Sequence, residues 1–363
     1  MRRIMRKGRK RARGRTCPKP LILLCLLPCF LLLDGCSAQT KETASQQAKE
    51  QSGQPLSEED ADAARTHGEI DDLISVGFSQ LGSESVWRSA NTVSVQETLT
   101  PENGYFLIYS NARQKQENQI KAIRSFISQR VDYIVFSPVT EDGWDTVLEE
   151  AREAGIPVIT SDRQVNVADP SLVTAWVGGD MVAEGTKAGQ WLKDNTAPDE
   201  DLEIVVLTGT EGSSAAMGRT EGFHSIADTM DNWHILEEKC GDFTRARGKE
   251  LMEQFLKTYD RIDVLVSQND DMTFGAIEAM EEAGITPGKD IRIISFDAVK
   301  MALEMVRDGT INVDVECSPL LGPYIDELIR AMEQGEEVGP DHPVDEMVFT
   351  AENVSEYLDE RTY

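Results

Sequence analysis

Short polar segments recur along the chain where apolar runs end, and their side chains are of the kinds that bind hydroxyl groups. Carboxylates, amides and a guanidinium can accept or donate hydrogen bonds in a plane, and Trp87 offers an aromatic face. A sugar hydroxyl both donates and accepts, while a C–H face of the ring packs on an aromatic. These residue types predict a site for a small polyhydroxylated ligand. The segments are Ser79–Arg88, Ser110–Asn111, Ser161–Arg163, Thr208–Thr210, Ser267–Asp271 and Phe296–Asp297.

The elements that must position these segments follow from the apolar pattern. From Leu73 onward, short apolar runs alternate with amphipathic stretches of helical length, which indicates successive βα units and parallel sheets. Ligands of such sheets bind beyond the carboxyl ends of the strands, where the polar segments lie. We therefore predict an α/β protein with two doubly wound parallel-sheet lobes. The expected strands are 73–78, 105–109, 133–136, 157–160, 173–177, 203–207, 234–237, 264–266, 292–295 and 312–315.

The first 35 residues differ from the rest in charge. The chain has a formal net charge of −28, yet ten basic residues and one acid precede residue 36. They lead into an apolar run, Leu21–Leu33, that is shorter than the roughly 20 residues of a membrane-spanning helix. The run ends in Leu33-Asp34-Gly35-Cys36, which resembles a bacterial lipobox. We predict a lipoprotein signal peptide over residues 1–35, with Cys36 lipidated; an uncleaved anchor is the alternative, and both place the body outside the cytoplasmic membrane.

Residues 36–72 have the composition of a tether. Between Ser37 and Asp72 there is no aromatic residue, and Leu56 and Ile70 are the sole large aliphatic residues. Such a segment cannot bury enough apolar surface to offset chain entropy, so we predict that it is disordered. The acidic charge of the body argues against binding nucleic acid.

The cysteines and histidines argue against a metal or a cofactor. Beyond the signal segment and Cys36, Cys240 and Cys317 remain, and their wide separation matches no metal motif. We expect two inert thiols, and a single disulfide bond between them is the alternative. Four scattered histidines make a zinc site unexpected. No Gly-x-Ser-x-Gly elbow and no Gly-x-Gly-x-x-Gly fingerprint is present, so neither a hydrolase nor a dehydrogenase is predicted.

Several longer strings resemble one known family. They are Val76–Gln80, Gly82–Ser85, Trp87-Arg88, Gln114–Ala122, Asp162-Arg163, Gly241–Arg245 and Asn269–Met272. On these strings the chain resembles, from about Ile74 to about Asn353, the type I periplasmic sugar-binding proteins of ABC importers, most of all the galactofuranose binders. The resemblance implies a monomer with no cofactor and no enzymatic activity, whose partners are a sugar and a permease in the cytoplasmic membrane.

The resemblance also implies a division of the chain and a set of contacts. It assigns residues 73–176 and 317–340 to an N-terminal lobe, and residues 177–316 and 341–363 to a C-terminal lobe. We expect three crossings between the lobes, near Val177, Asn269 and Glu316, which form a hinge. The implied sugar-binding residues are Glu84, Trp87, Arg88, Asn111, Asp162, Arg163, Arg219, Asn269, Asp297 and Glu316.

Some of these residues have a structural alternative. Glu84 and Asp162 could instead be acids at helix N-termini, and Trp87 could be a core residue. Asp271 is interpreted as a helix cap, and Asp297 as both cap and ligand. Asn111 stands where galactofuranose binders have an acid, so the resemblance does not fix the identity of the sugar. We expect galactofuranose or a similar aldose, and a ribose-like pentose or a cyclic autoinducer is the alternative. Delivery to a membrane signalling receptor is the alternative to import.

Overall fold

The computed structural model describes residues 72–363. The predicted signal peptide, Cys36 and the predicted tether up to residue 71 lie outside the described residues. Within the described range, no helix is long and apolar enough to cross a membrane.

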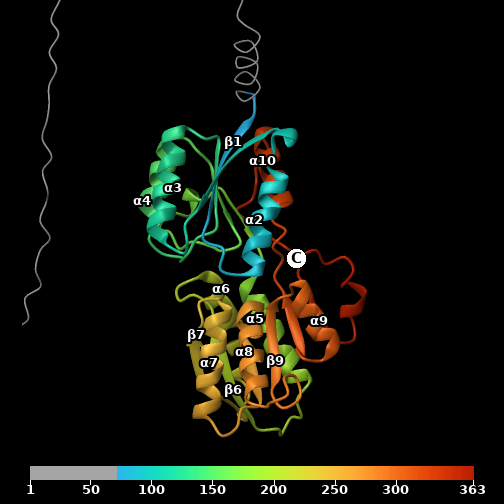
Figure 1. Cartoon of the computed structure of the whole chain (residues 1–363). Coiled ribbons are helices and arrows are strands. Elements are labelled where there is room, and N and C mark those ends of the chain that lie inside the picture. Colours follow the sequence, from blue (N-terminus) through green and yellow to red (C-terminus); the bar gives the residue numbers. More distant parts are fainter. Residues whose placement is uncertain (1–71) are drawn as a thin grey trace, which may run out of the picture. The chain divides into compact units, whose positions relative to one another are not determined.

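The first sheet has six strands, all parallel, in the order β11-β5-β4-β3-β1-β2. Its helices cover both faces: α2 and α10 lie on one side of β1, and α3 and α4 lie on the other (Figure 1). The strands are β1 (Ile74–Gln80), β2 (Tyr105–Asn111), β3 (Tyr133–Phe136), β4 (Val158–Ser161), β5 (Ala175–Gly178) and β11 (Asp341–Pro343). The helices are α2 (Val86–Thr98), α3 (Gln116–Gln129), α4 (Asp145–Glu153), α10 (Gly322–Glu333) and the 3-10 turns η1 (Pro101–Asn103) and η2 (Pro170–Leu172).

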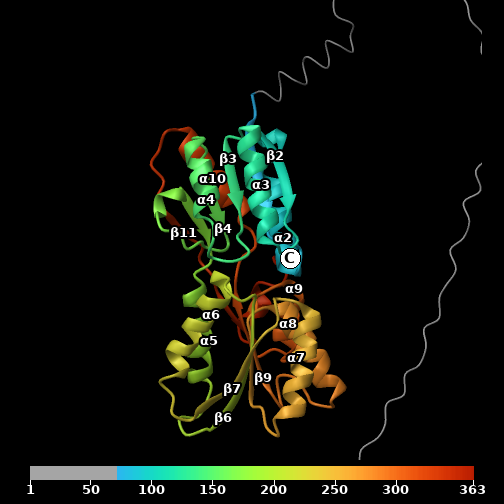
Figure 2. The same cartoon turned by 90° about the vertical axis from the view of Figure 1, so that its left-hand side faces the viewer.

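The second sheet repeats this plan in the order β12-β10-β9-β8-β6-β7, with β12 antiparallel to β10. Figure 2 shows α5 and α6 on one side of it and α7 and α8 on the other. The strands are β6 (Leu202–Thr208), β7 (Trp233–Cys240), β8 (Val264–Ser267), β9 (Arg292–Asp297), β10 (Val313–Glu316) and β12 (Val348–Thr350). The helices are α5 (Met181–Asp194), α6 (Ser214–Ala227), α7 (Arg245–Thr258), α8 (Asp270–Glu282), α9 (Lys300–Asp308) and the turn η3 (Val354–Glu356).

Apolar side chains facing both sides of each sheet form the cores. On the first sheet, Phe78 packs with the buried faces of α2 and α10, and Phe136 packs with those of α3 and α4. On the second, Phe296 lies under α5 and α6, and Phe255 on α7 packs with Phe274 on α8. The predicted two-lobe doubly wound fold is confirmed, and all ten expected strands are present.

The chain crosses between the two sheets three times. The crossings are residues 179–180 between β5 and α5, residues 317–321 between β10 and α10, and residues 344–347 between β11 and β12. The crossing predicted near Asn269 is wrong, because Asn269 joins β8 to α8 within the second lobe. The boundary predicted between residues 340 and 341 is also wrong, since Asp341–Pro343 pairs with β5 in the first sheet.

Candidate ligand-binding site

A small pocket lies where the carboxyl ends of the two sheets face each other. Its small size limits the ligand to a small molecule. Eight of the ten predicted sugar-binding residues line it. The full lining is Glu84, Ser85, Trp87, Arg88, Asp162, Arg163, Ala215, Arg219, Phe243, Asn269, Asp297 and Cys317.

Arg88 organises the wall contributed by the first lobe. The Ser85 hydroxyl accepts from the Arg88 backbone N–H and so begins helix α2, which places Trp87 and Arg88 in the first turn. Arg88 Nε lies 3.1 Å from Glu84 Oε1, and Nη2 lies 2.6 Å from Asp162 Oδ2. Burial lowers the pKa of Arg88, but the charges of Asp162 and Glu84 outweigh it and leave that pKa raised.

Glu84 and Asp162 therefore act as partners of Arg88. Glu84 lies before the Ser85 cap, and no acid occupies the first turn of α2. Asp162 follows strand β4 with a φ of +67°, a conformation that costs energy in a residue with a side chain. Trp87 is 4 % exposed and lines the pocket, and its Nε1 donates to the Cys317 carbonyl at 2.6 Å.

Arg163 lies deepest in the first-lobe wall, at 2 % exposure. Its Nη1 donates to the Val139 carbonyl at 2.9 Å, and its guanidinium lies 5.1 Å from the centre of the Phe243 ring. Burial and the neighbouring charge of Arg88 lower the pKa of Arg163 to about 10, so it remains a cation at neutral pH.

Arg219 on α6 organises the opposite wall. Its Nε donates to Glu184 Oε2 at 2.6 Å, its Nη2 lies 3.3 Å from Asp297 Oδ1, and its Nη1 donates to the Gln268 carbonyl. Burial raises the pKa of Asp297 well above its ordinary value, although Arg219 opposes the shift. Asp297 ends β9 with a φ of +108°, which parallels the strained Asp162 of the first lobe.

The cap of helix α8 differs from the prediction. Asn269 is the cap, since its Oδ1 accepts from the Met272 N–H at 3.0 Å, whereas Asp271 lies in the first turn. Asp271 Oδ2 instead accepts from the backbone N–H of Val86 at 2.9 Å. Asp271 thus bonds across the cleft to the start of α2, and the interpretation of Asp271 as the cap is wrong.

The two lobes are closed on each other around the pocket. Besides the bond from Val86 to Asp271, the Gln164 N–H donates to Ser214 Oγ at 2.9 Å, and the Glu141 N–H donates to the Gly212 carbonyl at 2.9 Å. These bonds join loops of the first lobe to the start of α6 in the second.

Two predicted residues lie outside the pocket. Asn111 ends strand β2, where its Oδ1 accepts from the Arg113 N–H at 2.8 Å, and it borders a separate depression beside Ser83. The Glu316 carboxylate accepts from Arg361 Nη1 at 2.7 Å and from the Met347 N–H at 3.0 Å. Both side chains are engaged by their own surroundings.

Phe243 is the main pocket residue that the sequence reasoning missed. It follows β7 at a φ of +57° and lines the pocket. Gly209 makes room for its ring, because a Cβ at Gly209 would lie 1.8 Å from Phe243 Cζ. The signal was present, since Phe243 lies within the string Gly241–Arg245 and is an aromatic residue.

Two buried polar atoms in the wall contributed by the first lobe lack a hydrogen-bond partner among residues 72–363. They are Glu84 Oε2 and Arg163 Nε, an acceptor and a donor. An unsatisfied buried polar group costs about 1–3 kcal/mol, so such atoms call for a partner. Both belong to residues that line the pocket, where a ligand with hydroxyl groups would supply that partner.

The fold and this pocket define a two-lobe solute-binding protein. Residues 76–319 match the family model described as the periplasmic binding protein domain, so the chain belongs to this family. The chain is 42 % identical over 266 residues to the galactofuranose-binding protein YtfQ of Escherichia coli (strain K12). The aligned region covers 72 % of this chain and 83 % of the relative.

Solved structures agree with this assignment. A Mycobacterium smegmatis protein in complex with beta-D-fucofuranose matches with a TM-score of 0.77 and 43 % identity, over 80 % of this chain and 96 % of its own. The binding component of the arabinose ABC transporter from Shewanella sp. ANA-3, bound to L-arabinofuranose, matches with a TM-score of 0.76 and 42 % identity. The match covers 79 % of this chain and 95 % of that protein.

The resemblance to type I sugar-binding proteins is thus confirmed. Family membership makes the chain a solute-binding protein of the extracytoplasmic compartment and not an enzyme.

Proposed function

We propose that the protein is the binding component of an ABC sugar importer and takes a furanose sugar, galactofuranose or a similar aldose. The observation that carries the proposal is that two residues of the pocket, Glu84 and Arg163, each have an unpartnered buried atom, Oε2 and Nε, while Trp87 and Phe243 line the same pocket. Hydroxyl groups would satisfy the polar atoms, and the C–H face of the ring would pack on an aromatic.

The furanose form is supported by the relatives. YtfQ is named for galactofuranose, and the two matching structures hold beta-D-fucofuranose and L-arabinofuranose. The pocket between the lobes is small, which favours a monosaccharide over an oligosaccharide.

Hinge closure is the proposed mode of binding. Arg163 comes from the first lobe and Arg219 from the second, so one small ligand touches both only when the cleft is shut. The sugar stabilises the closed state through contacts that the open state lacks. The permease then distinguishes a loaded binder by its closed shape.

The ligand is tested on the purified protein. Small molecules released from it are identified by mass spectrometry, and D-galactose, L-arabinose, D-ribose and D-fructose are then titrated by calorimetry. Carbon-13 NMR of the bound sugar reports its ring form, and we expect the furanose. A bound pyranose would contradict the furanose assignment, and the absence of binding by every sugar would contradict the function.

We also propose that Cys36 carries a lipid that anchors the protein to the outer face of the cytoplasmic membrane. The Leu33-Asp34-Gly35-Cys36 sequence supports this. Cys36→Ala should release the protein or leave an unprocessed precursor, which fractionation and mass measurement detect. Cys240→Ala is the control and should stay in the membrane fraction; wild-type protein found soluble and unlipidated would refute the anchor.

A further inference from the structure

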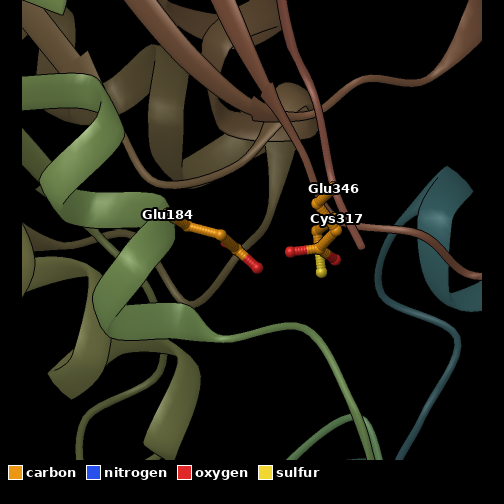
Figure 3. Close-up of side chains that lie close together, drawn as sticks. All are labelled: Glu184, Cys317 and Glu346. Atoms are coloured by element: carbon orange, nitrogen blue, oxygen red, sulfur yellow. The ribbon is translucent and has the colours of Figure 1, made fainter. Parts of the chain in front are cut away.

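Three side chains that could ligate a metal meet at the hinge. They are Glu184, Cys317 and Glu346, and their ligand atoms all lie within 4.8 Å of one another. Figure 3 shows the Glu184 carboxylate pointing toward the other two. Glu184 is in the first turn of α5 just after the first crossing, Cys317 begins the second crossing, and Glu346 lies in the third. Two of the crossings thus supply one group each, and the helix that follows the other crossing supplies the third.

One of these groups has an unused ligand atom. Glu184 is fully buried; its Oε2 accepts from Arg219 Nε at 2.6 Å, but its Oε1 has no hydrogen-bond partner in the part of the chain that the structure describes. Gly179 keeps the space beside it clear, since a Cβ there would lie 2.4 Å from Glu346 Oε1 and 2.7 Å from Glu184 Oε1. An unpartnered carboxylate oxygen is therefore aimed into the cluster.

The nearby cationic groups and N–H donors of the described structure leave Glu184 Oε1 without a partner. Arg219 is bound to the other oxygen of Glu184, the Ser318 N–H donates to Glu346 Oε1 at 3.0 Å, and Lys187 Nζ donates to the Glu346 backbone carbonyl. Glu184 and Glu346 repel each other when both are ionised, and a divalent cation bound between them would offset that repulsion.

We propose that Glu184, Cys317 and Glu346 bind a thiophilic divalent cation of the zinc class. Zinc accepts sulfur and carboxylate ligands at about 2.3 Å and 2.0–2.2 Å, so its tetrahedral ligands lie about 3.3–3.6 Å apart. Closing separations of up to 4.8 Å to these values needs movements of up to about 1.5 Å, and water takes the fourth position. Magnesium and calcium are excluded as the preferred ion, since they take oxygen ligands. The expectation of an inert Cys317 is replaced by this role.

The position of the site gives it a consequence for the hinge. A cation bound there joins the second and third crossings to helix α5, which follows the first, and restrains their relative movement. It also adjoins the sugar pocket, because Cys317 lines that pocket and Glu184 bonds Arg219, which lines it too. The metal would therefore favour one angle between the lobes.

The test uses the full-length chain, stripped with a chelator and titrated with zinc chloride alone or cobalt chloride alone. We expect one cysteine-dependent zinc per chain and, with cobalt, a thiolate charge-transfer band in the near ultraviolet. Cys317→Ser should abolish that band, and Cys317→Ser and Glu346→Gln should each weaken zinc binding at least tenfold. Because bound ligands must lose their protons, zinc affinity should rise between pH 6 and 8.

Two matched variants control the experiment. Cys240→Ser removes the other cysteine of the described residues, and Asp345→Asn removes an exposed acid next to Glu346; both should bind zinc as the wild type does. Circular dichroism checks that each variant folds. If the wild type binds no more tightly than Glu346→Gln, if cobalt gives no thiolate band, or if Cys240→Ser loses the zinc, the site is refuted. No sugar is added, so the result is independent of the proposed function.

Discussion

At the scale of single residues, the pocket is built from charges that are almost fully removed from water. Arg88 and Arg219 each hold two carboxylates, and these pairs come from one lobe each. Arg163 differs, because its Nε is 3.9 Å from the nearest carboxylate oxygen, on Asp162, and has no hydrogen-bond partner among the described residues. Arg163 is thus the cation with capacity left for a ligand.

Arg163→Ala should weaken sugar binding at least tenfold. Hydrogen bonds to a charged group contribute about 1.5–3 kcal/mol each, and about 1.4 kcal/mol corresponds to one factor of ten. Calorimetry measures the change. The control is Arg152→Ala, since Arg152 pairs with Asp169 in the same lobe on the exposed surface. Wild-type affinity in a folded Arg163→Ala protein would place the sugar elsewhere.

Trp87→Ala should weaken sugar binding about as much as Arg163→Ala, because the indole no longer packs against the sugar. It should also reduce the ligand-induced change in tryptophan fluorescence. Trp87→Phe keeps an aromatic face and loses the bond from Nε1 to the Cys317 carbonyl, so it separates the two contributions. If packing dominates, the titration of Trp87→Phe resembles that of the wild type. Equal losses in both variants would show that the indole N–H matters instead.

The sequence pointed to most of the pocket because its residues directly follow strands. Asp162, Arg163, Asn269 and Asp297 were found in this way. Asn111 also follows a strand, but its side chain bonds the next loop, and strand position alone does not determine where a side chain points.

At the scale of elements, the ten strands with apolar runs were predicted, and two short edge strands were not. β11 contains a proline and no apolar run, and β12 pairs antiparallel with β10. Pairing with a distant strand creates these elements, so no local pattern signals them. The third crossing lies between β11 and β12, which is why its position was missed.

The junction of α8 with β10 contains a pair of buried acids. Asp270 accepts from the Ser295 hydroxyl and the Val299 N–H, and Asp314 Oδ1 accepts from the Ala298 N–H, while Asp314 Oδ2 has no partner in the described structure. Burial, and then the charge of Asp314, raise the pKa of Asp270 well above its ordinary value, and burial raises the pKa of Asp314 to about 7. Below pH 7 the folded state therefore keeps a proton on Asp314 as well as one on Asp270.

Asp314→Asn should flatten the dependence of stability on pH. The unfolded pKa of an aspartate is about 3.9, so the folded wild type keeps a proton that the unfolded chain has lost. The stabilisation from that proton is complete below about pH 4 and is lost as pH rises through 7. Urea unfolding at pH 5 and pH 8 should show a smaller loss for Asp314→Asn than for the wild type. The exposed Asp359→Asn should follow the wild type, and equal slopes in all three would contradict the protonated pair.

At the scale of the whole binding body, three crossings connect the lobes. The closed cleft is held by bonds such as Gln164 to Ser214 and Val86 to Asp271, which an opened molecule would exchange for bonds to water. Such exchanges cost little, so opening and closing without ligand are compatible with the structure. A bound sugar adds contacts on both lobes and shifts the balance.

Small-angle scattering should therefore show a smaller radius of gyration when a confirmed ligand is saturating. The Arg163→Ala variant at the same sugar concentration is the control, since it should remain in the distribution of the sugar-free protein. Identical profiles of wild-type protein with and without ligand would favour a preformed, static pocket over hinge closure.

Strand β1 also determines where a mechanical load enters the molecule. The described chain begins just before β1 (Figure 1), whose carboxyl end leads to the pocket through Glu84, so the chain enters this strand at the end away from the pocket. β1 is also an interior strand, paired with β2 on one side and β3 on the other. A force applied through the preceding residues acts on one lobe alone, along a strand held on both sides. β1 and its partners β2 and β3 lie outside the three crossings, so a restraint on the preceding residues does not act directly on the segments that join the lobes.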